Sequence, residues 1–134
     1  MKVIPIKDIL LTQREVHCPN KAFVSYRFLL AKDGMGFSLH KTLVRAGGPY
    51  RWHYKHHLEA CYCVEGTGIL KNIITGEEYI IKPDTCYALD AHDPHEFTAL
   101  NDTILISVFN PPVTGGETHL ADGSYASGHG EYYV

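Results

Sequence analysis

Short apolar segments, each ended by turn residues, recur along most of the chain and restrict its fold more than any other feature. They cover residues 24–31, 37–44, 59–65, 68–74, 78–82, 85–89, 95–100 and 103–109. Between them stand turn formers such as Gly47-Gly48-Pro49, Thr75-Gly76 and Pro83-Asp84. Short strands at spacings of roughly 8–12 residues, with such turns between them, predict an all-β sandwich or barrel.

The two ends of the chain carry weaker signals. Residues 6–14 fit a short N-terminal helical stretch of one or two turns. Residues 110–134 are rich in Gly, Pro, Ser and Tyr, which predicts an irregular tail and a candidate lid over the barrel mouth. Because 134 residues with 45% hydrophobic content suffice for one core, we expect a single domain over residues 1–134.

Charge and the N-terminal residues exclude several classes of function. The chain has 12 Lys and Arg against 15 Asp and Glu, so no basic excess is available to neutralise nucleic acid. It contains no apolar run of about 18 residues, and we therefore expect no membrane span. The first residues, MKVIPIKDIL, are too short and too charged for a signal peptide, which favours a cytoplasmic protein.

The four cysteines are Cys18, Cys61, Cys63 and Cys86. Three of them lie in apolar segments, and Cys61-x-Cys63 lacks the CxxC spacing of redox and zinc motifs, so we expect reduced thiols. Strand alternation adds a more specific prediction. If Glu59 points into a barrel, Cys61 and Cys63 point inward too, while Tyr62 and Val64 face outward.

Histidine is abundant, and five of the nine histidines lie between residues 53 and 95. In residues 47–66, the order Gly47, His53, Glu59 and Gly66 resembles the first cupin motif, G-x5-H-x-H-x3-4-E-x6-G. Lys55 stands where that motif has its second histidine. In the second half of the pattern a Pro-containing turn is present, but Tyr87 occupies the region where a histidine ligand is expected.

Alternate residues of each strand line the interior of a barrel, so side chains distant in sequence can meet there. Glu59 on one strand, with Tyr87 or His95 on others, can therefore converge on one cation. A mixed oxygen and nitrogen donor set suits Fe(II) or a similar divalent ion better than a thiolate zinc site. For His53, His56 and His57, exposure on a surface loop is an equally good interpretation.

Four longer stretches match one family in order and spacing. They are GMGFSLHKT (34–42), YKHHLEACYCVEG (54–66), IKPDTCYALDAHDPH (81–95) and FNPPVTGGETHLADGSY (109–125), preceded by REVH (14–17). Together they resemble ectoine synthase, a family of small cupins. The resemblance implies an all-β cupin jelly-roll barrel that forms a homodimer and carries Fe(II) or another divalent metal. It also implies a carbon–oxygen hydro-lyase that closes N-gamma-acetyl-L-2,4-diaminobutyrate into the osmolyte ectoine with loss of water.

The resemblance also assigns residues to roles. The metal ligands fall on Glu59, Tyr87 and His95; the substrate-binding positions on Phe23, Arg27, His40, Thr42 and Phe109; the catalytic positions on Tyr54, His57, Glu117 and His119. Two positions depart from the family pattern. Phe23 replaces the usual Trp but keeps an aromatic wall, and His40 stands where many members have Asn or a similar residue.

In the implied reaction the α-amine of the substrate attacks its own acetamide carbonyl. Arg27 would hold the substrate carboxylate, and His57, His119 and Glu117 are candidates for proton transfer. Two other functions share this fold and stay open at this point. One is another metal-dependent cupin enzyme, a dioxygenase or lyase acting on a different small metabolite; the other is a non-catalytic cupin that binds ectoine.

Overall fold

The computed structural model describes residues 1–118 and 123–125. The elements are η1 (Ile6–Asp8), β1 (Glu15–His17), β2 (Phe23–Leu29), η2 (Ala31–Asp33), β3 (Ser38–Val44), β4 (Gly47–Trp52), β5 (Leu58–Glu65), β6 (Gly68–Asn72), β7 (Glu78–Ile81), β8 (Cys86–Leu89), β9 (His95–Ala99) and β10 (Thr103–Asn110). The regular secondary structure of the described chain is thus almost entirely β, as predicted. It contains no helix long and apolar enough to cross a membrane.

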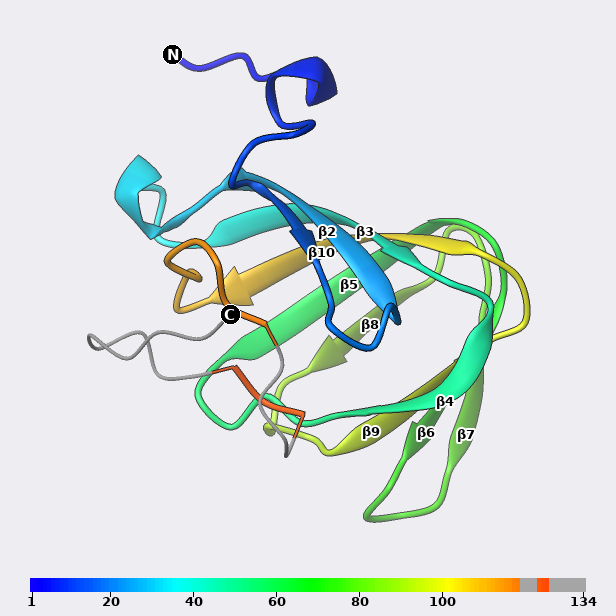
Figure 1. The fold of residues 1–134 in the computed structure, drawn as a ribbon. Coiled ribbons are helices and arrows are strands. Elements are labelled where there is room, and N and C mark those ends of the chain that lie inside the picture. Colours follow the sequence, from blue (N-terminus) through cyan, green and yellow to red (C-terminus); the bar gives the residue numbers. More distant parts are fainter. Residues whose placement is uncertain (119–122, 126–134) are drawn as a thin grey trace.

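The strands form two antiparallel sheets that face each other across the core (Figure 1). The larger sheet has the order β1-β2-β3-β10-β5-β8, and the smaller one has the order β4-β9-β6-β7. Apolar side chains from both sheets, among them Phe23, Leu105, Trp52 and Phe97, are buried between them. The interior is therefore walled by two sheets, which is the arrangement that lets residues far apart in sequence meet.

All eight strands predicted from the apolar segments are present, with ends shifted by no more than two residues. The prediction for residues 47–52 was wrong. Gly47-Gly48-Pro49 was assigned to a turn, yet these residues begin β4, which pairs with β9 through Tyr50↔Phe97 and Trp52↔His95. Cross-strand pairing overrides the local turn signal here, and positive φ angles at Gly47 and Gly48 accompany a register shift.

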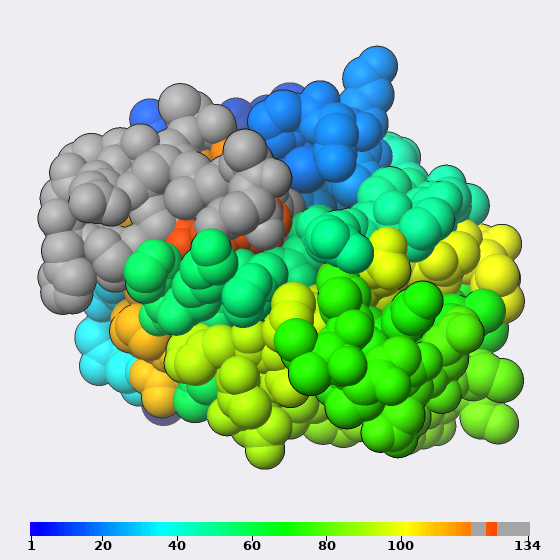
Figure 2. Space-filling view, turned by 90° about the horizontal axis from the view of Figure 1, so that it is seen from below, coloured from blue at the N-terminus to red at the C-terminus, as the bar shows by residue number. Residues whose placement is uncertain are grey.

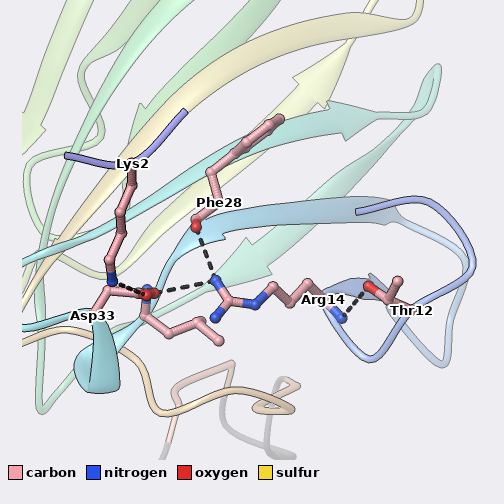
Figure 3. Close-up of polar contacts among 6 residues, drawn as sticks. Lys2, Thr12, Arg14, Phe28 and Asp33 are labelled. Carbon is pink, nitrogen blue, oxygen red and sulfur yellow. Dashed lines mark hydrogen bonds and ion pairs between the residues drawn. The ribbon is translucent and has the colours of Figure 1, made fainter. Parts of the chain in front are cut away.

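The N-terminal residues are tied to the larger sheet by one carboxylate (Figure 3). Asp33 accepts from Lys2 Nζ at 2.7 Å, from Arg14 at 3.1 Å and from the N–H of Leu30 at 2.8 Å. Arg14 also donates to the carbonyl of Phe28 at 2.9 Å. The predicted helical stretch of residues 6–14 is a single 3-10 turn, Ile6–Asp8.

The chain after β10 lies at the end of the sheets where β4 connects to β5 (Figure 1). The N–H of Ala31 donates to the carbonyl of Val113, and the N–H of His53 donates to that of Gly123. The described part of the C-terminal tail is therefore fastened to both sheets at one mouth of the barrel.

Candidate active site

The strand register of the larger sheet places five side chains in one row across it. The row runs Arg27, His40, Ser107, Cys61 and Tyr87, over β2, β3, β10, β5 and β8. Phe109 and Glu59 are paired in the next row of the same face. Neighbouring strands thus supply five of the twelve predicted site residues side by side, although the residues of the two rows span 83 positions of the sequence counted from Arg27 to Phe109.

A small cavity lies between the two sheets over this face. Its lining residues are Phe23, His40, Thr42, Val44, Trp52, Tyr54, Glu59, Tyr87, Leu105, Ser107, Phe109 and Tyr125. Seven of these were predicted as site residues, so the structure brings most of the predicted set around one space. The free volume is only about 20 Å³, room for about one water molecule. A substrate would therefore enter only if lining side chains or the adjoining C-terminal segment move.

Glu59 is a buried carboxylate in this cavity, with 8% of its surface exposed. Burial raises the pKa of Glu59 to about 8, although hydrogen bonds with Cys61 and Ser107 act in the opposite direction. The ring of Tyr87 is partly exposed, but burial of its hydroxyl raises its pKa well above the usual value. Two acidic groups with raised pKa values, side by side on one wall, are the environment that a cation would stabilise.

His95 reaches the same region from the smaller sheet. Its Nδ1 lies 2.9 Å from the carbonyl of Asp93, so Nδ1 carries the hydrogen and Nε2 the lone pair. Within the described residues, Nε2 of His95 is buried and has no hydrogen-bond partner. Burial also lowers the pKa of His95 to about 4, which keeps the ring neutral at pH 7. A neutral imidazole fixed through Nδ1 by a carbonyl is a typical metal ligand.

Residues 1–118 and 123–125 contain no cluster of three His, Cys, Asp or Glu side chains that could hold a metal ion. A metal site in this region would therefore need the phenol oxygen of Tyr87 together with Glu59 and His95. The donor set fits a divalent ion, because the orphaned Nε2 of His95 and the two buried acids supply one nitrogen and two oxygens.

Two other predicted residues, Arg27 and Glu117, hold the segment that follows β10. The guanidinium of Arg27 donates to the carbonyls of Gly115 and Glu117 at 2.5 and 2.6 Å, and its Nε donates to Ser25 at 3.1 Å. The carboxylate of Glu117 accepts from the N–H groups of Thr114 and Gly115, both at 2.6 Å. Burial raises the pKa of Glu117, but these N–H groups outweigh it and the net pKa is lowered, so the group is ionised at pH 7.

His40, where the sequence departs from the family, faces the cavity as a hydrogen-bond donor. Its Nδ1 lies 3.3 Å from the hydroxyl of Ser25, which already accepts from Arg27. In the tautomer in which the Ser25 hydroxyl donates to Nδ1, the ring hydrogen resides on Nε2. In the described part of the chain this Nε2 is buried without a partner. Burial and the charges of Arg27 and His57 hold the pKa of His40 well below its usual value.

Tyr54 and His57 come from the loop between β4 and β5, and both are buried. The ring of Tyr54 contacts His95 and Phe109, with centroids 6.0 and 5.1 Å apart. The ring of His57 stands edge-on to Phe109 at 5.9 Å, and its Nδ1 has no partner within the described residues. Burial lowers the pKa of His57, against the opposing charge of Glu117.

The remaining predicted positions are Thr42, Phe23 and His119. Thr42 contacts Ser107 through their hydroxyls at 3.0 Å, and Phe23 packs edge-on against Trp52 at 6.0 Å. His119 lies outside the described residues. Sequence reasoning missed five lining residues, which are Val44, Trp52, Leu105, Ser107 and Tyr125. Ser107 was detectable as the polar residue in the apolar run TILISVF, whereas Trp52 was hidden because its strand was not recognised.

Alternation along β5 is as predicted. Glu59, Cys61 and Cys63 are buried, whereas Tyr62 and Val64 are 44% and 48% exposed. The four cysteines, all of which lie in the described range, form no disulfide with one another; Cys18, Cys61 and Cys63 are buried and Cys86 is exposed.

Comparison with known proteins gives a consistent result. Residues 1–129 match the family described as ectoine synthase. An L-ectoine synthase of Halalkalibacterium halodurans is 45% identical over 125 residues, which cover 93% of this chain and 95% of that protein. A crystal structure of ectoine synthase from P. lautus superposes with a TM-score of 0.80 at 42% identity, covering 85% of this chain and 80% of that one. A cupin domain of an XRE family transcriptional regulator from Enterobacter cloacae, 18% identical with a TM-score of 0.55 over 68% of this chain and 98% of that one, shares the fold alone.

Proposed function

The chain belongs to the ectoine synthase family, and from this premise we propose that it closes N-gamma-acetyl-L-2,4-diaminobutyrate into ectoine with release of water. The observation that carries the proposal is the small cavity between the sheets, which Glu59 and Tyr87 line together with polar and aromatic side chains. His95, which has an unpartnered buried Nε2, lies next to it, with its ring 6.0 Å from that of the lining residue Tyr54. A cyclisation needs such a cavity because the amine and the amide carbonyl of a flexible substrate must be held together.

Glu59, Tyr87 and His95 are the residues that would hold a divalent metal, and we propose Fe(II). When bound there, the ion would act as a Lewis acid that makes the amide carbonyl more electrophilic. Fe(II) accepts mixed carboxylate, phenolate and imidazole donors, which is the set these residues offer. Other divalent ions can bind the same donors, so metal content is part of the test.

The chain's own residues would fold and orient the substrate. Phe23, Phe109 and Tyr54 supply aromatic walls that exclude water, and Thr42 and His40 supply polar contacts. The N–H of His40 is directed at the cavity and can donate to a substrate oxygen. Because His40 is held as a neutral ring, it would act as a donor in a single tautomer rather than as a cation.

Arg27 was expected to bind the substrate carboxylate. The hydrogen bonds that its guanidinium already makes restrict how it can do so. Its donors already bind the carbonyls of Gly115 and Glu117. Arg27 is fully buried, and we propose that a carboxylate would bind its guanidinium by replacing at least one of these carbonyls, so that substrate binding and a shift of residues 115–117 would be coupled. The same coupling would let the tail act as a lid.

Two proton transfers must occur, since the attacking amine loses a proton and the departing oxygen gains one. We assign Glu117 as a proton acceptor because its carboxylate is ionised at pH 7; the N–H groups of Thr114 and Gly115, which lower its pKa, also weaken it as a base, so they would have to release it first. Neutral His57, whose ring lies near Phe109 and Tyr125, can relay a proton through its unpartnered Nδ1. His119 remains a third candidate on the basis of the family resemblance.

We also propose a homodimer in the cytoplasm. The family resemblance supports the dimer, and four cysteines that form no disulfide with one another are compatible with a reducing compartment. Within the described residues, β8 pairs with β5 on one side and has no strand on the other, which leaves an edge available for association. Light scattering of the purified protein tests the dimer, and a monomer at micromolar concentration would contradict it.

The function is tested by adding N-gamma-acetyl-L-2,4-diaminobutyrate to the Fe(II)-loaded protein and measuring ectoine by chromatography. We expect ectoine from the wild type and loss of both metal and activity in Glu59→Ala, with kcat reduced by about 100-fold or more. Removing a buried acid relieves a burial cost, so the thermal stability of the metal-free variant should not fall. The control is Glu65→Ala, an exposed glutamate on the same strand, which should keep both. Full cyclisation by Glu59→Ala would contradict the assignment, and no ectoine from the wild type would contradict the function.

A further inference from the structure

His92 lies in the connection between β8 and β9 and belongs to none of the residues assigned above. Its Nδ1 lies 2.9 Å from the carbonyl oxygen of Tyr54 and 3.1 Å from that of His57. A carbonyl oxygen can only accept, so Nδ1 must carry the hydrogen and share it between the two oxygens. One side chain therefore binds both ends of the loop segment that presents the two buried rings.

The backbone of His92 is adapted to this contact. Its φ angle is +51°, in the left-handed region that few residues other than glycine adopt. Such a conformation persists where surrounding contacts fix it, and it occurs disproportionately at functional sites. The His92 side chain is exposed, so it lies outside the cavity and is not positioned to touch a substrate.

Asp93, the residue after His92, fixes the orientation of the His95 ring. The carbonyl of Asp93 accepts from Nδ1 of His95, which leaves Nε2 of that ring free for a metal. The carbonyl of Pro94 accepts from the N–H of Ile73 and anchors the turn to the smaller sheet. Consecutive residues of one turn thus hold the loop of Tyr54 and His57 on one side and the ring of His95 on the other.

The two segments that His92 joins, the β8–β9 turn and the β4–β5 loop, are also neighbours on the molecular surface. Figure 2 shows the β8–β9 turn, in yellow-green, next to the β4–β5 loop in green on the same face. The chain just before this segment is held by the N–H of His53, which donates to the carbonyl of Gly123 at 2.9 Å. Loss of the His92 side chain would remove the hydrogen bonds to the carbonyls of Tyr54 and His57, while the contacts of their rings with Phe109 and Tyr125 remain.

We propose that His92 is a positioning residue for the cyclisation: it holds Tyr54 and His57 in register with the metal ligand His95. The proposal rests on the function proposed above. It predicts that His92 affects turnover through these residues, without binding metal or substrate itself.

Two substitutions separate the hydrogen bond from the backbone conformation. His92→Gly adopts the left-handed φ freely but has no donor, whereas His92→Asn tolerates this φ and carries an amide N–H close to the position of Nδ1. We expect kcat of His92→Gly to fall by roughly 10- to 100-fold, since small misplacements of catalytic groups cost this much. KM and the metal content should stay within about twofold of wild type. His92→Asn should recover most of the lost kcat.

Leu11→Gly is the matched control, because Leu11 has φ +60°, is exposed and lies outside the site. It should leave kcat and KM unchanged. If His92→Gly turns over like the wild type, or if His92→Asn is as slow as His92→Gly, the positioning role is wrong. A wild type that forms no ectoine would instead contradict the proposed function, so the two failures are distinguishable.

A second measurement needs no substitution. In water, neutral histidine prefers the hydrogen on Nε2, but the two carbonyl contacts require it on Nδ1 of His92. Long-range 1H–15N spectra of the protein loaded with diamagnetic Zn2+ should show the Nδ1–H tautomer for His92 at pH 8. The Nε2–H tautomer, or rapid exchange between the two, would overturn the proposal even if the His92→Gly variant fails to fold.

Discussion

In the metal-free protein the buried carboxyl of Glu59 keeps its proton at pH 7, and a cation that binds there must displace it. Its pKa of about 8 means that the carboxyl of the metal-free protein is largely protonated at pH 7. His95, with a pKa of about 4, is already neutral and has no proton to lose. Metal binding at this site would therefore compete with protons at Glu59, and also at Tyr87 if it binds as phenolate.

This competition predicts the pH dependence of metal affinity. The association constant should rise about tenfold from pH 6 to 7 and about fivefold from pH 7 to 8, because one proton leaves Glu59 for each ion bound and its pKa is about 8. Above the pKa of about 8 the contribution of Glu59 should vanish. Chelator competition at several pH values measures the slope. An affinity that is flat from pH 6 to 8 would mean that Glu59 is either not a ligand or not protonated.

The raised pKa of Glu59 also makes the stability of the metal-free protein depend on pH. Because the pKa of Glu59 is raised on folding, the folded state binds more protons than the unfolded state between pH 4.5 and about 8. Its contribution to stability is therefore present at low pH and is lost as the pH rises through this window. Urea denaturation of the metal-free protein at pH 6 and 8 would detect the loss, and Glu59→Gln should abolish it.

At the scale of elements, the turn between β5 and β6 depends on one glycine. Gly66, the last residue of the partial cupin motif, has φ +87°, and a Cβ at this position would lie 2.6 Å from Cα of Thr103. The backbone of β10 begins there and cannot give way easily. The motif glycine thus serves close packing of two strands rather than metal chemistry.

Gly66→Ala should therefore destabilise the protein by about 3 kcal/mol or more, through backbone strain and the clash with β10. Gly76→Ala is the matched control, since Gly76 has φ +77° but a Cβ added there would meet no atom within 4 Å. It should cost only about 1 kcal/mol. Urea unfolding of the two variants gives the comparison, and equal losses would show that the approach of β10 to this turn contributes nothing.

The elements also show how far sequence alone could lead. The alternation of β5 and the eight apolar segments follow from local pattern, so the strands and the inward position of Glu59 were predictable. The row from Arg27 to Tyr87 depends on the register of five strands, which no local pattern encodes. β4 was missed because its glycines and proline signal a turn, and its lining residue Trp52 was missed with it. His92 had no signal in the sequence, since its role depends on a fold contact 35 to 38 residues away.

At the scale of the whole molecule, Asp33 links regions that lie far apart in the sequence. It joins the N-terminal residue Lys2, the start of β1 through Arg14 and the end of β2 through Leu30 (Figure 3). Neighbouring Ala31 donates to Val113 at the beginning of the tail. The hydrogen bond from Lys2, then those from Leu30 and Arg14, hold the pKa of Asp33 well below its usual value. Its stabilising effect is thus present above pH 3.8 and is lost as the pH falls below that value.

Asp33→Ala should lower the free energy of unfolding by about 2 kcal/mol at pH 7, because it removes hydrogen bonds from two charged groups and from the N–H of Leu30. Lys2→Ala should cost less than about 0.5 kcal/mol, because the side chain of Lys2 is 54% exposed and its ion pair is screened by water. Asp33→Asn should fall between the two, since it keeps an acceptor for Leu30 but loses both ion pairs. Urea denaturation measures all three, with metal content as a check that the barrel interior is intact. An Asp33→Ala protein as stable as Lys2→Ala would mean that the N-terminal residues are held by other contacts, and that Asp33 does not join them to the barrel.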